Sequence, residues 1–206
     1  MSDVERPEVN EQPLIAASQR GDVTAFNRLV ILYQEQAYNL AYRMLGNSES
    51  AADAAQDTFV SAFQAIKSFR GGSFRAWVLR IATNACYDQL RRAQRQPAVS
   101  LDAIIEETGD VPPIASNSPT PEEVASRKEL AAYIQRSLLE LPPEQRIVVA
   151  LSDVQGFAYE EIAEITRGSL GTVKSRLSRG RAHLRDYLLR QPELLPSDFR
   201  HKSRGT

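Results

Sequence analysis

The sequence predicts an all-α protein made of two small helical domains joined by a flexible acidic linker, the second being a helix-turn-helix domain. Apolar residues recur at three- and four-residue spacing through two long blocks, and no alternating strand pattern or hairpin turn signal interrupts them. A proline-rich acidic stretch separates the blocks. The predicted units are a first domain at 14–96, a linker at 97–121 and a second domain at 122–191.

Local signals give the bounds of three helices in the first block. Asp22 is an expected N-cap for the first helix, and Gly46 is the residue type that ends it. Ser48 is the expected cap of the second helix, and Ser73 opens a third after the break at Gly71-Gly72. The apolar face of the second helix is expected to comprise Ala52, Ala55, Phe59, Ala62, Phe63 and Ile66.

The second block contains the elements of a helix-turn-helix unit. Its first helix opens at Thr120–Glu123, where a threonine, a proline and two glutamates match a capping box. A short helix is predicted over Tyr159–Thr166, followed by a tight turn at Arg167–Leu170. A long helix then runs from Gly171 or Thr172 to Arg190. A short helix, a tight turn and a basic helix in this order indicate a DNA-binding unit.

The formal net charge of −1 conceals a marked asymmetry along the chain. Residues 14–96 carry ten basic and six acidic side chains, and residues 131–191 carry nine basic and seven acidic ones. Residues 97–130 between them carry two basic and seven acidic side chains. Two basic blocks therefore flank an acidic connector, and such blocks suit a polyanionic partner although the whole chain is nearly neutral.

Composition excludes several classes of protein. The single cysteine, Cys86, cannot form an internal disulfide, and no apolar run approaches the roughly 18 residues needed to span a bilayer. The acidic N-terminus lacks a signal-peptide pattern, so we expect a cytoplasmic protein without membrane insertion. The two histidines, His183 and His201, have no catalytic partners at useful spacing, and no phosphate-binding loop or metal motif occurs. We expect no catalytic residue, no metal, no cofactor and no enzyme activity.

The long helix of the second block carries the strongest signal for duplex DNA. Between Lys174 and Arg190 it has six basic side chains and one acidic one. A solvated basic face is the alternative on charge alone, but the preceding short helix and turn favour a major-groove reader. Lys174 and Ser178 are expected to touch base edges, and Arg176 and Arg181 to include phosphate contacts. The expected duplex-binding set is Thr172, Lys174, Ser175, Arg176, Ser178, Arg179 and Arg181.

The third helix of the first block and the loop before it mix aromatic and basic residues. Stacking rings together with positive charge suit single-stranded nucleic acid. The alternative interpretation places the aromatic rings in the hydrophobic core, which is the commoner outcome at helical spacing. The expected single-strand set is Phe69, Arg70, Phe74, Arg75, Trp77, Arg80, Asn84 and Tyr87.

The second helix has a polar face opposite its apolar stripe. Asp53, Gln56 and Asp57 lie on this face, with Phe59 and Phe63 at its edge. A solvated surface is the default for such a face, and a binding surface for a partner protein is the alternative.

Taken in order, these segments resemble the extracytoplasmic-function sigma factors of the sigma-70 family of bacterial RNA polymerase. The resemblance runs from about residue 14 to residue 190. It depends on six segments in sequence, which are Gly21–Phe26, Ala52–Phe59, Phe69–Asn84, Leu141–Arg146, Tyr159–Ala163 and Gly171–Leu177. Each segment is modest alone, and their common order is specific.

The resemblance implies a transcription initiation factor that binds core RNA polymerase and reads the −10 and −35 promoter elements. It assigns the second-helix face to core polymerase, the aromatic-basic set to single-stranded −10 DNA and the basic helix to duplex −35 DNA. It also implies an anti-sigma factor as a partner, and a linker that passes through a polymerase channel. Two alternatives remain: a helix-turn-helix regulator that acts without being a polymerase subunit, and a helical nucleic-acid enzyme.

Overall fold

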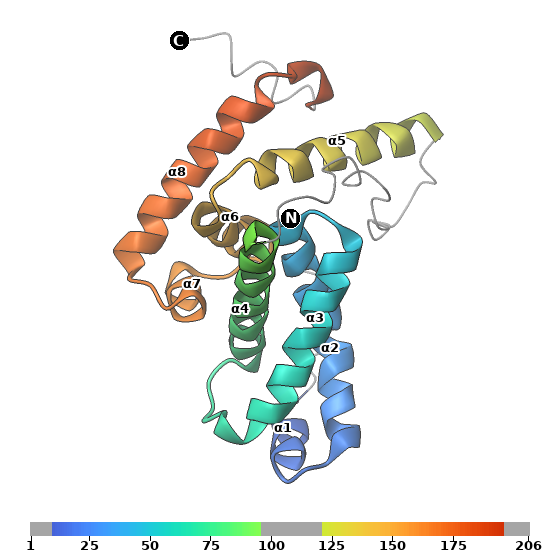
Figure 1. Cartoon of the computed structure of the whole chain (residues 1–206), viewed down its shortest axis with the longest axis vertical. Helices are drawn as coiled ribbons and strands as arrows, with labels where there is room; N and C mark the ends of the chain where they lie inside the picture. Colours follow the sequence, from blue (N-terminus) through green and yellow to red (C-terminus); the bar gives the residue numbers. More distant parts are fainter. Residues whose placement is uncertain (1–9, 96–120, 196–206) are drawn as a thin grey trace.

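The computed structural model describes residues 10–95 and 121–195, which form helices and the turns between them (Figure 1). The first part contains α1 (Gln12–Gln19), α2 (Val23–Leu45), α3 (Ser48–Ala65), a 3-10 turn η1 (Ile66–Ser68) and α4 (Phe74–Arg95). The second part contains α5 (Pro121–Leu139), α6 (Pro143–Val149), a π-helical turn η3 (Ala150–Val154), α7 (Tyr159–Thr166), α8 (Leu170–Leu188) and a 3-10 turn η4 (Pro192–Leu194). The all-α prediction is confirmed for these residues, while the predicted linker up to residue 120 lies outside them.

The first part is a bundle in which α2, α3 and α4 pack against one another and α1 packs on α2. Helix α1 was not predicted, although Ile15 from its middle is buried. The loop before α4 contributes Phe69 to the same core. The buried residues of this cluster are Ile15, Phe26, Leu29, Ala62, Ile66, Phe69, Phe74, Trp77 and Val78.

The predicted helix signals of the first part are confirmed at α2 and shifted by one residue at α3. The Asp22 carboxylate accepts a hydrogen bond from the backbone N–H of Ala25 at 3.0 Å, and Gly46 ends α2 with a left-handed φ of 85°. At α3 the cap is Asn47, whose side-chain oxygen accepts from the N–H of Ser50 at 2.7 Å. The prediction of Ser48 as the cap was therefore wrong, because the asparagine before it performs the same function.

The buried face of α3 also differs from the predicted one. Ala52 is exposed, whereas Ala51 and Ala54 are fully buried. Six alanines in this helix leave the apolar period ambiguous, so the sequence did not fix which stripe faces inward. Thr58 is also buried, and its hydroxyl is satisfied by donating to the carbonyl of Ala54 at 2.6 Å.

The two parts pack directly against each other. In Figure 1 the end of α2 lies next to α5 and α6, and α4 lies next to α7, and these pairs are in contact. One continuous cluster of buried residues joins Leu40, Met44 and Leu79 of the first part to Ile147 and Ile162 of the second. The predicted second domain therefore shares a hydrophobic core with the first in this arrangement.

A buried arginine links the helix ends at this contact. Arg146 is 7% exposed and donates to the carbonyl of Met44 in the last turn of α2. It also donates to the carbonyls of Leu139 at 2.6 Å and Leu141 at 2.9 Å, at the end of α5. Carbonyl groups at helix C-termini lack intrahelical donors and carry partial negative charge, so a guanidinium is well placed there. Burial lowers the pKa of Arg146 from its ordinary value.

A carboxamide relay forms a second polar link between the same two helices. Arg43 of α2 donates to the Oε1 of Gln135 in α5 at 2.7 Å. The Nε2 of Gln135 donates to the carbonyl of Tyr42 at 3.0 Å. Gln135 is only 5% exposed, so these bonds satisfy both ends of a buried amide.

Helix α8 approaches α6 closely because Gly180 has no side chain. A Cβ atom built at Gly180 would lie 2.8 Å from the Cγ2 of Val149, which is itself buried. Gly171 in the first turn of α8 has only the Ser169 hydroxyl nearby, at 3.8 Å from such a Cβ. The two glycines therefore occupy sterically opposite environments in one helix.

We expect Gly180→Ala to destabilise the protein and Gly171→Ala to leave it unchanged or slightly more stable. Overpacking a buried contact costs about 1–3 kcal/mol, which exceeds the helix-propensity gain of about 1 kcal/mol from replacing glycine with alanine. The measurement is the urea midpoint of unfolding followed by circular dichroism. Equal midpoints for the two variants would contradict the close packing of α8 on α6.

Within the described residues, no helix combines the length and the apolar character that crossing a membrane requires.

Candidate nucleic-acid interface

The outer face of α8 presents a polar row made of members of the expected duplex-binding set. Lys174, Ser178 and Arg181 are exposed, and with Tyr159 of α7 they line a surface hollow of about 540 Å³. Positions three and four apart share a helix face, which explains why these side chains come together. The opposite stripe of α8 is buried through Val173 and Leu177. The buried stripe therefore anchors α8 to the core, while the polar side chains on its outer face stay accessible.

The turn before α8 is a Schellman motif with an arginine in the glycine position. Arg167 has a left-handed φ of 52°, the only positive φ outside glycine in the described residues. The N–H of Gly168 donates to the carbonyl of Ala163 at 2.9 Å, and the N–H of Arg167 donates to Glu164 at 3.4 Å. This motif ends α7 and sets its angle to α8.

Ser169 is the N-cap of α8, so the helix begins at Leu170 and not at Gly171 or Thr172. The Ser169 hydroxyl accepts from the N–H of Thr172 at 3.1 Å. The two hydroxyls of Ser169 and Thr172 also lie within 2.9 Å of each other. Thr172 is half-buried and takes part in capping, and its expected role in the duplex-binding set remains a prediction.

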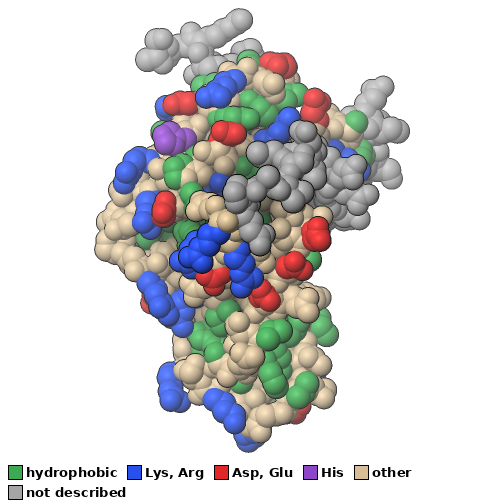
Figure 2. All heavy atoms as spheres, viewed as in Figure 1, with side chains coloured by type: hydrophobic (Ala, Val, Ile, Leu, Met, Phe, Trp, Pro, Cys, Tyr) green, Lys and Arg blue, Asp and Glu red, His purple; other side chains and the backbone are tan. Residues whose placement is uncertain are grey.

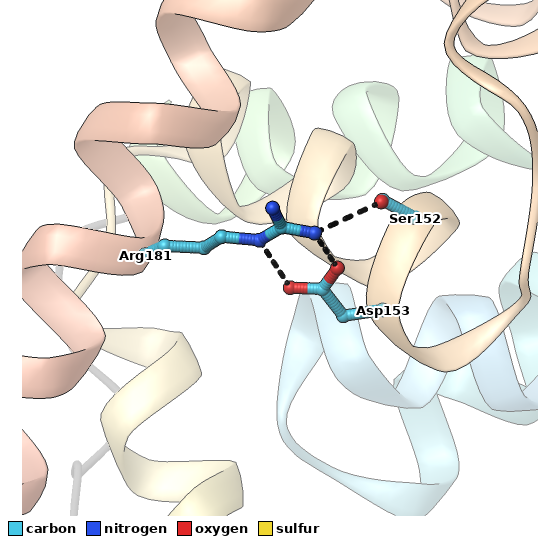
Figure 3. A network of polar contacts seen from close by, with 3 residues as sticks. All are labelled: Ser152, Asp153 and Arg181. Atoms are coloured by element: carbon cyan, nitrogen blue, oxygen red, sulfur yellow. Dashed lines mark hydrogen bonds and ion pairs between the residues drawn. The ribbon is translucent and has the colours of Figure 1, made fainter.

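Arg181 is held in place by an acidic residue of the π-helical turn. Its Nε donates to Asp153 Oδ2 at 3.0 Å and its Nη2 donates to Oδ1 at 2.5 Å, with Ser152 Oγ 3.5 Å away (Figure 3). The hydrogen bond to the Asp153 carboxylate is the main cause that raises the pKa of Arg181 above its ordinary value. The bidentate pair fixes the guanidinium and neutralises its charge in this structure.

The remaining basic residues of the duplex-binding set differ in accessibility. Arg179 is exposed and bends back along α8, donating to the Ser175 carbonyl at 3.2 Å and to its hydroxyl at 3.3 Å. Arg176 is half-buried and close enough to Tyr87 of α4 to lower the pKa of that phenol, whose net shift is upward because of burial. Arg176 therefore faces the first part of the chain, unlike Lys174 on the open face.

The aromatic residues of the expected single-strand set form core. Phe69, Phe74 and Trp77 are 6%, 1% and 9% exposed, and their ring centroids lie 5.4 to 5.5 Å apart. The structure thus agrees with the alternative interpretation for these three rings, because they pack on one another and are almost wholly buried. Tyr87 is half-buried against the core that joins the two parts.

Arg75 from the same set binds the second part of the chain. Its Nη2 donates to the carbonyl of Gln155 at 2.6 Å, and its Nε donates to Gln36 Oε1 at 2.8 Å. The guanidinium also lies 4.0 Å from the ring centroid of Phe157, a cation–π contact. Gln155 in turn donates to the Gln36 carbonyl at 3.2 Å. In this arrangement Arg75 is engaged between the parts.

The accessible members of the single-strand set are polar. Arg70 and Asn84 are exposed, and Arg80 is half-buried one turn before Asn84 on α4. Arg70 and Arg80 line a hollow of about 310 Å³, whose far wall includes Glu164 of α7. The second part of the chain therefore lies against the same surface that the loop and α4 would present to DNA.

The exposed face of α3 combines acidic and apolar side chains. Asp53, Gln56 and Asp57 are exposed, and Phe63 is 38% exposed with its ring edge-on to Phe26, centroids 5.0 Å apart. Figure 2 shows hydrophobic side chains gathered over the region of α2 and α3, with acidic side chains next to them. Phe59 is half-buried and packs on both core clusters.

Val60 belongs to this face although it is not among the residues expected from the sequence. It is 51% exposed and lies three residues after Asp57 and three before Phe63. Its helical spacing was the signal that would have found it. A face with carboxylates at one end and exposed apolar groups at the other is suited to a protein partner.

Two family models match the chain, and they do so in the order of its two parts. The model described as Sigma-70 region 2 matches residues 29–96, and the model described as Sigma-70, region 4 matches residues 131–184. The ECF RNA polymerase sigma factor SigW of Bacillus subtilis is 38% identical over 173 residues, covering 82% of this chain and 91% of the relative. The ECF sigma factor SigE of Mycolicibacterium smegmatis is also 38% identical, and the match covers 84% of this chain but 65% of that relative.

Solved structures with similar folds were also found. The structure of CnrH in complex with the cytosolic domain of CnrY has a TM-score of 0.62 at 27% identity, covering 87% of this chain and 97% of that chain. The sigma factor RpoE in complex with the anti-sigma factor NepR from Bartonella quintana has a TM-score of 0.60 at 28% identity, covering 81% of this chain and 98% of that chain.

We expect Asp153→Asn to strengthen binding of the full-length protein to duplex DNA, because it releases the charge of Arg181. The slope of log affinity against log salt concentration should become steeper by about one unit, the effect of one added phosphate contact. Fluorescence anisotropy with a labelled duplex at several salt concentrations measures both quantities. Glu129→Gln on α5 is the matched control, since it removes one exposed acidic charge elsewhere. An equal gain in both variants would show that only net charge matters.

Proposed function

The chain belongs to the extracytoplasmic-function group of the sigma-70 family, and from this membership we propose how its surfaces serve a promoter-specificity factor of RNA polymerase. Helix α8 reads the −35 duplex, the surface of α4 and its preceding loop binds the −10 strand, and α3 binds core polymerase. The observation that carries the proposal is the exposed row of Lys174, Ser178 and Arg181 on the second helix of a helix-turn-helix unit. In this proposal Lys174 and Ser178 present hydrogen-bond donors to the major groove, and Arg181 contacts phosphate once its guanidinium leaves Asp153.

In this proposal, exposed polar side chains contact the −10 DNA, and a cluster of buried aromatic rings supports them. Arg70 and Asn84 are accessible, and the cluster of Phe69, Phe74 and Trp77 holds the loop and the start of α4 in place beneath them. Arginine supplies charge for phosphates and a carboxamide supplies paired donor and acceptor groups for a base edge. Because Arg75 is engaged by Gln155, the proposal requires the two parts to separate before this surface takes up DNA.

The proposed polymerase surface is the exposed face of α3, defined by Asp53, Gln56, Asp57, Val60 and Phe63. Its charged end supplies orientation and its exposed valine and phenylalanine supply apolar contact area. We also propose a protein inhibitor as a partner, since similar folds were solved in complexes with an anti-sigma factor and with a cytosolic domain of CnrY.

We expect Asp57→Arg to abolish assembly with core polymerase while leaving the helical content unchanged. The substitution reverses a charge at the centre of the α3 face, and like-charge contacts across an interface cost several kcal/mol. Assembly is measured by size-exclusion chromatography with core enzyme, and folding by circular dichroism. Glu35→Arg on α2 is the control, because it makes the same charge reversal at another exposed position. Normal assembly by Asp57→Arg would remove α3 from the proposal.

We expect Asn84→Ala to reduce open-complex formation on duplex promoters by about tenfold, since a lost base contact costs about 1–3 kcal/mol. Permanganate footprinting of the holoenzyme reports the melted bases. A template with a preformed bubble should restore only the part of the defect that arises from melting. Gln94→Ala, a carboxamide removal at the end of α4, should leave the footprint unchanged. A wild-type footprint with Asn84→Ala would show that the residue does not read DNA.

A further inference from the structure

The loop between η1 and α4 has few contacts of its own. After Phe69, which is buried, the chain passes through Gly71 and Gly72 with left-handed φ values of 103° and 86°. A Cβ atom at either glycine would have no neighbour within 4 Å. Glycine loses more conformational freedom on folding than any other residue. The conformation of a loop with two glycines therefore depends on the contacts that its flanking residues make.

Gln19 at the end of α1 holds one end of this loop. Its Nε2 donates to the carbonyl of Phe69 at 2.8 Å and to the carbonyl of Ile66 at 3.2 Å. Both partners are acceptors, which fixes the orientation of the amide, and both carbonyls belong to the segment that leads into the glycines. The bonds connect residues about fifty positions apart in the sequence, so they tie the loop to a different helix.

Helix α1 provides a fixed support for Gln19. Ile15 is 3% exposed in the same core cluster as Phe69, and Ser18 is buried with its hydroxyl bonded to the Leu14 carbonyl at 2.7 Å. Figure 1 shows α1 beside the end of α3, next to the loop that precedes α4. Gln19 and Arg70 both line a surface hollow of about 520 Å³ between α1 and the loop. The Gln19 carboxamide therefore joins α1 to the loop backbone at this hollow, one residue before Arg70.

We infer that Gln19 is a positioning residue for −10 recognition, acting through the backbone of the loop and not through contact with DNA. With Gln19 in place, Arg70 and the double-glycine turn are presented in one conformation, and this conformation favours particular bases at the −10 element. The inference rests on the proposed function of this surface. It adds a helix that lies before residue 29, where the match to the region 2 model begins.

The test uses holoenzyme assembled from the full-length chain and core polymerase, with a promoter library randomised at the −10 element. Gln19→Ala removes both donors, and Gln19→Glu replaces them with an acceptor that repels the two carbonyls. Gln19→Lys keeps an N–H donor of similar reach. Gln12→Ala is the matched control, because Gln12 lines the same hollow from α1 and its side chain makes no hydrogen bond to the loop in the described structure.

The Ala and Glu variants are expected to reduce transcription from preferred −10 sequences by about 3- to 10-fold, the effect of losing one or two hydrogen bonds, and to flatten the base preference. The Lys variant and Gln12→Ala should keep the wild-type preference. Transcription from a −35 library and assembly with core polymerase should be unchanged throughout. If Gln19→Ala proves unstable, the contrast between Glu and Lys still decides the question.

Two results would overturn the inference. One is an unchanged −10 preference in Gln19→Glu while wild-type holoenzyme clearly selects −10 sequences. The other is an equal loss for all promoters, with reduced assembly, in both Glu and Lys variants, which would make Gln19 a general stabilising residue. A wild-type protein that selects no −10 sequence at all would instead refute the proposed function.

Discussion

The arrangement of the two parts depends on a guanidinium that fills the space between two helix ends. Arg146 donates to carbonyls from the last turn of α2 and from the end of α5, and it does so from inside the protein. Removing its side chain would leave these carbonyls buried and unpaired, which costs about 1–3 kcal/mol for each group. The shared core, from Met44 to Ile147, surrounds a junction in which Arg146 pairs three backbone carbonyls through its terminal nitrogens, while its buried Nε has no hydrogen-bond partner in the described structure.

The sequence predicted the helical architecture wherever a local signal was unambiguous. Asp22 begins α2 and Gly46 ends it, as expected. A capping carboxylate and a glycine with a left-handed φ each need only the adjacent turn of the helix to have their effect. It failed where several residues could serve equally, as with Asn47 and Ser48 or the alanine stripes of α3. Helix α1 and the π-helical turn were not predicted, since α1 is short and its stability comes from Ile15 packing on the bundle.

In the site, too, features that depend on local spacing could be predicted from the sequence, and contacts between distant segments could not. The exposed side chains of Lys174, Ser178 and Arg181 share one face of α8 because of their three- and four-residue spacing, which is a local property of the sequence. The pairing of Arg181 with Asp153 and the engagement of Arg75 by Gln155 join distant segments, so no local pattern announced them. The hydrogen bonds from Gln19 to the loop before α4 are of the same kind. The sequence shows which side chains carry charge. Which of them are exposed and which are paired within the protein depends on the packing of the helices.

The chemistry of the contacts between the two parts determines which agents can open them. The bonds made by Arg43, Arg75 and Arg146 pair guanidinium groups with carbonyl or carboxamide oxygens. These acceptors do not titrate, and a guanidinium stays protonated throughout the physiological range. Acidification within that range therefore does not weaken these hydrogen bonds. A phosphate oxygen is a stronger acceptor for arginine than an amide oxygen, so we expect the polar contacts between the two parts to respond to competing phosphate groups rather than to a change in protonation.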